Sequence, residues 1–206
     1  MGRILKRLLD ACCLAVMAPC AWSCAIDGRL GDAAFSWWAQ TCAIVPGLPG
    51  VFLRRAFYRL TLDRCAGCFY VGFGAVFSQR RVVIEEDVYV GPYAVIGSST
   101  LRRGCLIGTR ASVLSGNDLH TFGGDGRWTS TDPARVQQIE IGEHAWIGEA
   151  AVVMADVGPS AMVGAGSVVS SRVPPRVVVA GNPARFARHL TIETHEDTND
   201  AIVSLR

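Results

Sequence analysis

The stretch IGEHAWIGEAAVVMADVGPSAMVGAGSVVS, residues 141–170, decides the fold, because an aliphatic residue returns in it at every sixth position. The aliphatic positions form two series, Ile141, Ile147 and Val153, then Val157, Val163 and Val169. Glycine and other small residues recur at fixed places between them. A period of six matches neither the α-helix, at about 3.6, nor the strand, at about 2, and short repeats of this kind are typical of hexapeptide β-helices.

The same period extends through residues 65–113. Its large apolar members are Val71, Phe77, Ile84, Val90, Ile96, Leu101, Ile107 and Val113. Three hexapeptides make one triangular turn, and turns stacked at about 4.8 Å place these side chains in one internal ladder. We therefore predict an all-β domain, a parallel β-helix over residues 65–190, followed by a polar tail over residues 191–206.

Composition limits the classes of partner. The 206 residues suffice for one domain and an N-terminal appendage. The net charge is +2 and the charged fraction is 18%, below the average of about 25%, so we expect no nucleic-acid partner.

The eight cysteines lie in the apolar N-terminal run and at or near repeat positions, which favours buried thiols over a disulfide framework. Cys65 and Cys68 have CxxC spacing without a second pair, and we expect no metal.

Residues 1–64 form the apolar, helical appendage. An uncharged run over residues 11–26 follows three basic residues, as in a secretory signal. Asp10, Pro19 and a length below the ~20 residues of a membrane-spanning helix argue against that interpretation. The alternative is a hydrophobic helical hairpin that packs on its own trimer.

Residues 51–64 have a helical period and carry four arginines among aromatic and aliphatic residues, namely Arg54, Arg55, Arg59 and Arg64. This pattern is typical of an interfacial helix, so we expect peripheral contact with the inner face of the cell membrane. The alternative is a helical cap that covers the first coil of the stack.

The ladder stops at an excursion loop, residues 115–138, with the sequence SGNDLHTFGGDGRWTSTDPARVQQ. The loop is rich in Gly, Asp, Ser and Thr and has no period. Long excursions from a compact fold are usually functional or disordered. Because regular coil holds both ends of the excursion loop, we expect the loop to be functional.

Three segments that follow this histidine-bearing loop resemble a known family. They are IGEHAWIGEAAVV (141–153), VGAGSVV (163–169) and VPPRVVVAGNPAR (173–185). The resemblance is to the left-handed β-helix acyltransferases of the hexapeptide-repeat class, in particular to the sugar and polysaccharide O-acetyltransferase and xenobiotic acetyltransferase branch. It covers residues 65–189 and implies a left-handed coil and a homotrimer with active sites between neighbouring subunits.

Acyl transfer to a hydroxyl group needs a base that removes the proton during attack, and histidine suits this role near neutral pH. His120 lies in the excursion loop, where the family carries its catalytic histidine. Asp118 is a candidate for orienting the imidazole, with a turn cap as the alternative. His144 falls at an outward repeat position and His189 near the end of the domain, where surface roles are expected.

The resemblance also implies acetyl-CoA as the acyl donor. The implied donor-binding residues are Trp146, Gly148 and Glu149 along the pantetheine channel, the backbone of Ala165 and Gly166 beside its amides, and Ser170, Ser171, Arg185 and Arg188 toward the adenosine phosphates. Each has a structural alternative, since the coil requires Gly148 and Ala165 in any case.

We therefore predict an acetyl-CoA-dependent O-acetyltransferase that acts on a sugar hydroxyl in surface polysaccharide or glycolipid biosynthesis. We expect it in the cytoplasm, at the inner face of the membrane. Serine O-acetyltransferase or another small-molecule acetyltransferase is the alternative. A γ-type carbonic anhydrase would need three histidines around zinc, and a scaffold would not need the loop; both are less favoured.

Overall fold

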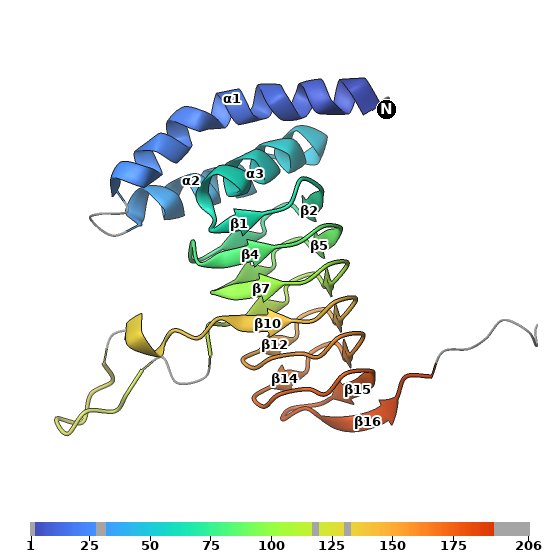
Figure 1. Cartoon of the computed structure of the whole chain (residues 1–206). Helices are drawn as coiled ribbons and strands as arrows, with labels where there is room; N and C mark the ends of the chain where they lie inside the picture. Colours follow the sequence, from blue (N-terminus) through green and yellow to red (C-terminus); the bar gives the residue numbers. More distant parts are fainter. Residues whose placement is uncertain (1–2, 28–31, 117–119, 130–132, 192–206) are drawn as a thin grey trace, which may run out of the picture.

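The computed structural model describes residues 3–27, 32–116, 120–129 and 133–191. Three helices lie across one end of a triangular coil of short strands (Figure 1). The coil begins with β1 (Arg64–Cys65) and ends with β16 (Arg185–His189), and the excursion loop with its short 3-10 helix (Pro133–Arg135) interrupts it once. The predicted hexapeptide β-helix with a helical N-terminal appendage is therefore confirmed. Most of the predicted polar tail, residues 192–206, lies outside the described residues.

The coil has three sheets, one for each side of the triangle. Sheet A holds β1, β4 (Val82–Ile84), β7 (Ser99–Leu101) and β10 (Ile139–Ile141). Sheet B holds β2 (Phe69–Val71), β5 (Val88–Val90), β8 (Leu106–Ile107), β11 (Trp146–Ile147), β13 (Met162–Val163), β15 (Val177–Ala180) and β16. Sheet C holds β3 (Val76–Phe77), β6 (Val95–Ile96), β9 (Ser112–Val113), β12 (Val152–Val153) and β14 (Val168–Val169). Neighbouring strands run parallel, except that β16 folds back antiparallel on β15.

The predicted aliphatic ladder fills the coil. In sheet B, Val90, Ile107, Ile147 and Val163 stand in register on successive turns and are fully buried. A Cβ atom at Gly148 would lie 2.5 Å from the amide nitrogen of Ala165 on the next turn. The spacing between turns therefore requires glycine at position 148, which confirms the structural alternative given for Gly148 in the sequence analysis.

The helices close the N-terminal end of this ladder. α3 (Gly47–Thr61) lies on the first turn, and its Phe57 and Tyr58 side chains are fully buried. The Tyr58 ring lies 4.5 Å from that of Phe77, and the Phe77 amide donates a hydrogen bond to the Tyr58 hydroxyl. α3 is thus a helical cap on the first coil, the alternative to an interfacial helix.

Arg54 and Arg55 of α3 do not face a membrane, so the prediction of an interfacial helix is wrong for them. Arg54 is 1% exposed and donates hydrogen bonds to the backbone carbonyls of Val71, Cys42 and Val45. The last carbonyls of α2 (Ala33–Ala43) have no partners within that helix, and the guanidinium supplies donors to them. Arg55 forms an ion pair with Asp10 of α1 (Arg3–Asp27).

α1 is longer than the sequence pattern indicated. The helix continues through Pro19, and its segment Leu8–Asp27 has the length and composition of a membrane-spanning helix. The predicted shortness is therefore wrong, because Leu8 and Leu9 extend the apolar run and the charge of Asp10 is paired with Arg55.

The eight cysteines all lie within the described residues, and each carries a thiol. Cys24, Cys42 and Cys105 are buried in the helical cap and the coil. Burial raises the pKa of Cys42 to about 11 and that of Cys105 to about 12, so both stay protonated at neutral pH. They act as small apolar side chains, as predicted.

Replacing Arg54→Ala should lower the free energy of unfolding by about 2–4 kcal/mol, because the backbone carbonyls of Val71, Cys42 and Val45 each lose a hydrogen bond from the buried guanidinium. Chemical denaturation followed by circular dichroism measures this change. Arg64→Ala, at an exposed position in β1, is the matched control and should stay within about 0.5 kcal/mol of the parent protein. Equal stability of the two variants would contradict the role given to Arg54.

Candidate functional site

The excursion loop leaves the coil after β9 and rejoins it at β10, on one side of the molecule (Figure 1). Its neck is closed by hydrogen bonds from the Gln137 amide to the Ser115 carbonyl, 2.9 Å, and from the Ser98 amide to Ser115 Oγ, 2.8 Å. β10 pairs directly with β7, with Ile139 opposite Ser99. The loop is thus an insertion that leaves the stacking of the turns intact and projects from a rigid base.

Inside the loop the chain forms a short antiparallel hairpin, which the aperiodic sequence did not reveal. Phe122 pairs with Trp128, and their rings meet edge to face at 5.3 Å. The Thr129 amide donates to the Thr121 carbonyl at 2.8 Å, as does the Gly123 amide to the Arg127 carbonyl. The signal that could have shown the hairpin is the glycine-rich turn at residues 123–126 between two aromatic residues.

His120 begins this hairpin and is exposed. Its Nδ1 atom lies 2.9 Å from the backbone carbonyl oxygen of Thr129. A carbonyl oxygen only accepts, so Nδ1 carries the hydrogen and Nε2 keeps a lone pair for an incoming proton. Asp118, the predicted orienting residue, lies outside the described residues, and the carbonyl of Thr129 orients the imidazole.

Four of the predicted donor-binding residues come together at one edge of the coil. Trp146 points outward from sheet B, 48% exposed, between Leu106 and Met162 of the adjacent turns. Glu149 is exposed at the corner between sheets B and C, and Ala165 and Gly166 occupy the same corner one turn further. The Gly166 amide donates to the Glu149 carbonyl at 2.8 Å, so the coil uses this amide and leaves only the Gly166 carbonyl for a ligand.

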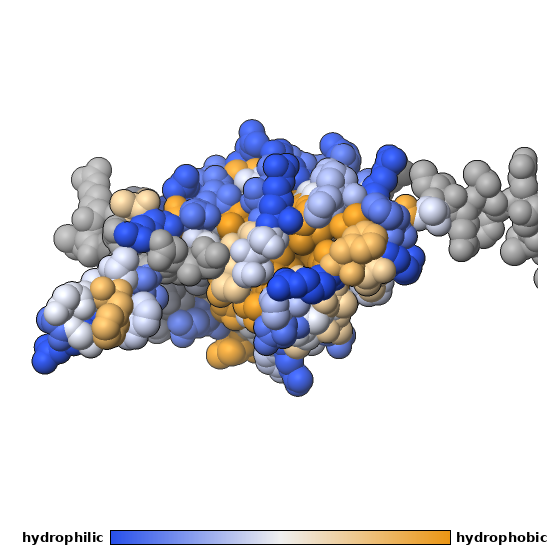
Figure 2. Space-filling model, turned by 90° about the horizontal axis from the view of Figure 1, so that it is seen from below, coloured by the Kyte–Doolittle hydropathy of each residue, from blue (hydrophilic) through white to orange (hydrophobic). Residues whose placement is uncertain are grey.

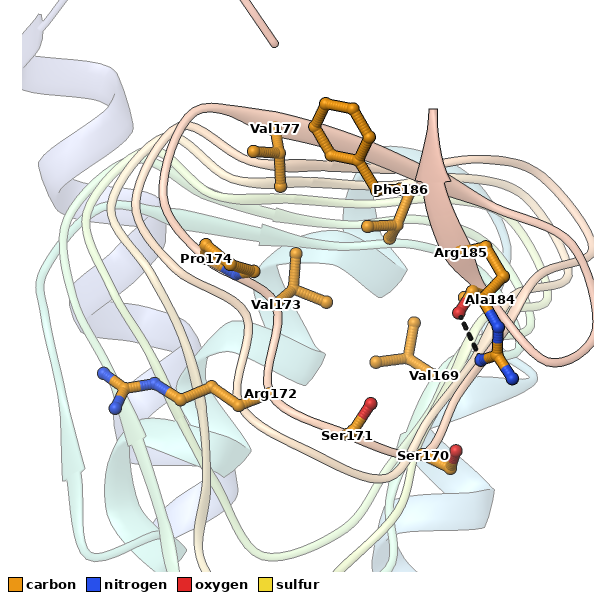
Figure 3. Close-up of a pocket in the computed structure, with 11 residues that line it drawn as sticks. Val169, Ser170, Ser171, Arg172, Val173, Pro174, Val177, Ala184, Arg185 and Phe186 are labelled. Atoms are coloured by element: carbon orange, nitrogen blue, oxygen red, sulfur yellow. Dashed lines mark hydrogen bonds between the residues drawn. The ribbon is translucent and has the colours of Figure 1, made fainter. Parts of the chain in front are cut away.

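Three further predicted residues meet at the C-terminal end of the coil. Ser170, Ser171 and Arg185 line a hollow of about 230 Å³, shown in Figure 3. Its other walls are mainly apolar and include Val169, Val173, Val177, Val179 and Phe186. Figure 2, which views the molecule from this end, shows apolar residues gathered at its centre. Arg188 is not part of the hollow; it lies exposed on β16, opposite Val178 of β15.

Among the described residues, the side chains that could hold a metal are Cys68, Glu86 and Asp87. The Glu86 carboxylate already accepts hydrogen bonds from the amides of Gly67 and Cys68, at 3.2 and 3.0 Å. This group contains no histidine, and it lies on the first two turns of the coil, away from the excursion loop. These hydrogen bonds link the first turn of the coil to the second.

The solved structures that resemble the chain in fold include two acetyltransferases. One is the hexapeptide-repeat containing acetyltransferase VCA0836 from Vibrio cholerae O1 biovar eltor, complexed with acetyl coenzyme A; it is 23% identical, the match covers 78% of this chain and 92% of that one, and the TM-score is 0.61. The chain has the hexapeptide-repeat β-helix fold. The other is a galactoside acetyltransferase in complex with coenzyme A, 20% identical, with 76% and 80% of the chains covered and a TM-score of 0.62. No protein-family model and no curated protein sequence matches the chain.

The hexapeptide-repeat coil holds His120 and Trp146 on different sides of one chain. The loop that carries His120 connects sheet C to sheet A, and Trp146 lies on sheet B, the side of the triangle opposite that connection (Figure 1). A single chain therefore does not bring the candidate base to the edge that carries Trp146.

Proposed function

We propose that this protein transfers an acetyl group from acetyl-CoA to a hydroxyl group of a saccharide, with His120 as general base. The observation that carries the proposal is the hydrogen bond from His120 Nδ1 to the Thr129 carbonyl, which leaves Nε2 ready to accept a proton. The two acetyltransferase structures described above, bound to acetyl coenzyme A and to coenzyme A, support the choice of donor.

In the proposed reaction His120 Nε2 takes the proton of the acceptor hydroxyl as its oxygen attacks the thioester carbonyl carbon. The carbon–sulfur bond then breaks, and the proton passes from the imidazolium to the leaving thiolate of coenzyme A. The Thr129 carbonyl holds the Nδ1 hydrogen throughout, so the ring keeps its orientation while it carries the positive charge.

The chemical groups of acetyl-CoA match the side chains of the predicted donor-binding residues. The apolar walls of the C-terminal hollow suit an adenine ring, and the exposed guanidinium of Arg185 suits a phosphate group. Ser170 and Ser171 offer hydroxyl groups on the same rim. Trp146 provides an apolar surface along which the pantetheine arm can extend.

We propose a cyclic homotrimer, because one copy separates His120 from Trp146. In a closed ring, each copy presents the corner between its sheets C and A to sheet B of a neighbour. The excursion loop of one copy would then meet the edge of the next copy that carries Trp146. This arrangement makes each active site a joint product of two chains.

The choice of a saccharide rests on the aromatic residues beside His120. Phe122 and Trp128 are 62% and 70% exposed, although large aromatic side chains are usually buried. Phe122 follows His120 by two residues, and Trp128 precedes Thr129, whose carbonyl holds the imidazole. Aromatic faces of this kind stack on the C–H face of a sugar ring and would hold its hydroxyl near Nε2.

His120→Ala should lower kcat by about 10²–10⁴-fold, because the attacking hydroxyl loses its base, while the KM for acetyl-CoA changes little. Consumption of the thioester, assayed against a panel of sugars and saccharide lipids, measures both parameters. His144→Ala, an exposed histidine at a corner of the coil, is the control and should keep the parent rate. An unchanged kcat in His120→Ala would exclude His120 as the base.

Arg185→Ala should raise the KM for acetyl-CoA by about 10-fold and lower kcat less, because it removes a charge contact with the bound donor and leaves the reacting atoms untouched. Steady-state kinetics with acetyl-CoA as the varied substrate tests this. The matched control is Arg176→Ala, another exposed arginine on the last turn, outside the hollow. A fall in kcat alone would contradict the assignment of Arg185 to donor binding.

Mixed assemblies test whether two chains share each site. Co-expressed His120→Ala and Arg185→Ala chains should regain activity at low acetyl-CoA concentration, with about a quarter of the sites holding both intact residues if the chains assort at random. The purified mixture is compared with each variant alone. Activity equal to the mean of the two variants would show that each chain carries a complete site.

A further inference from the structure

From Leu8 to Ile26, the exposed face of α1 is apolar. Leu8, Val16, Trp22 and Ile26 are 59%, 63%, 70% and 50% exposed. Every exposed residue between positions 8 and 26 is apolar, namely Leu8, Ala11, Cys12, Ala15, Val16, Ala18, Pro19, Trp22, Ala25 and Ile26. We name these ten residues the outer face of α1. A continuous exposed surface of this kind indicates a partner.

The helical cap exposes further large apolar side chains outside α1. Trp37 is 61% exposed, Ile44 70% and Leu48 68%. Tryptophan is enriched where protein meets the interface of a membrane, because its ring has both an apolar body and a polar N–H group. The cap therefore concentrates exposed apolar side chains at the end of the coil that lies away from the C-terminal hollow.

The opposite face of α1 is bound to the rest of the protein. Met17 and Cys24 are buried, and Asp10 pairs with Arg55. Trp38 of α2 donates a hydrogen bond to Ser23 Oγ at 3.0 Å, and Arg80 of the coil donates to the Cys24 carbonyl at 3.2 Å. These contacts hold α1 crosswise over the end of the coil, as Figure 1 shows.

This attachment decides between two ways of meeting a bilayer. A spanning helix would have to leave α2, α3 and the coil, and it would carry Asp10 into hydrocarbon without its partner Arg55. A helix that lies in the plane of the membrane keeps these contacts and buries only its outer face. The structure therefore favours the second arrangement, although Leu8–Asp27 has the length to span.

Charge indicates which lipids would be bound. The sequence places Arg3, Lys6 and Arg7 in the first turns of α1, immediately before the outer face begins. Cations beside an apolar helical face attract anionic headgroups. We propose that the outer face of α1 inserts, in plane, into the surface of a bilayer that contains anionic phospholipids. This proposal is independent of the acetyl transfer proposed above, and either can fail alone.

Vesicle flotation with the full chain tests the proposal. The protein should float with vesicles of phosphatidylcholine and phosphatidylglycerol, and Val16→Glu combined with Trp22→Glu should lower its partition coefficient about 100-fold, because two large side chains leave the membrane and two charges oppose insertion. Val95→Glu places one such charge on an exposed valine of sheet C, away from the helices, and should bind like the parent protein. Equal partitioning of the double variant and the parent, or no partitioning of the parent, would overturn the proposal.

Two further measurements distinguish the lipids and the depth. Replacing Arg3, Lys6 and Arg7 by Gln should weaken binding to the mixed vesicles at least 10-fold and leave binding to pure phosphatidylcholine unchanged. The fluorescence of Trp22 is the part of the signal that Trp22→Phe removes. Lipids brominated near the headgroup should quench this fluorescence more strongly than lipids brominated at the chain ends. Strongest quenching at the chain ends, with resistance to alkaline extraction, would show a spanning helix and overturn the in-plane arrangement.

A second copy of the chain is the competing occupant of the outer face. In that case the parent protein would self-associate and would not bind vesicles, and Val16→Glu combined with Trp22→Glu would abolish the self-association. That result would overturn the proposal. Transfer from acetyl-CoA to a water-soluble saccharide should be unchanged in the double variant, and circular dichroism confirms that it is folded. Loss of lipid binding and loss of catalysis are thereby measured separately.

Discussion

A coil of stacked turns satisfies its backbone and its apolar core everywhere except at its two ends. Along the stack, each strand pairs with the same strand of the next turn, and the aliphatic ladder is closed on all sides. At an end, both the strand edges and the last rung of the ladder would meet water. The positions of the three helices and of β16 follow from the need to cover these two ends.

The two ends are covered differently. At the N-terminal end, α3 lays Phe57 and Tyr58 on the first turn, and Arg54 joins the carbonyl end of α2 to Val71 of that turn. At the C-terminal end, β16 folds back along one sheet and leaves a hollow rimmed by Ser170, Ser171 and Arg185. The first end is closed by a layer of helices, and the second stays open enough to admit a ligand.

The sequence predicted what depends on residues close together in the chain. The period of six gave the coil, and the loss of that period gave the excursion loop. Interactions between distant residues were not predictable, since Arg54 finds its acceptors at Cys42, Val45 and Val71. The partner of His120 is a backbone carbonyl, which no residue type reveals. The Arg55–Asp10 pair likewise turned an apparent break in α1 into part of a continuous helix.

The position of the excursion loop along the coil has a consequence for the acceptor. The loop leaves after β9, on the third turn below the helices. Two helical layers at about 8–10 Å each and two steps between turns at about 4.8 Å place it roughly 30 Å from the outer side of α1. If α1 rests in a bilayer and the acceptor is the proposed saccharide on a lipid phosphate, a single sugar would be too short to reach the base of this loop. An oligosaccharide of several units can reach it, so the number of turns between cap and loop would set a minimum length for the substrate.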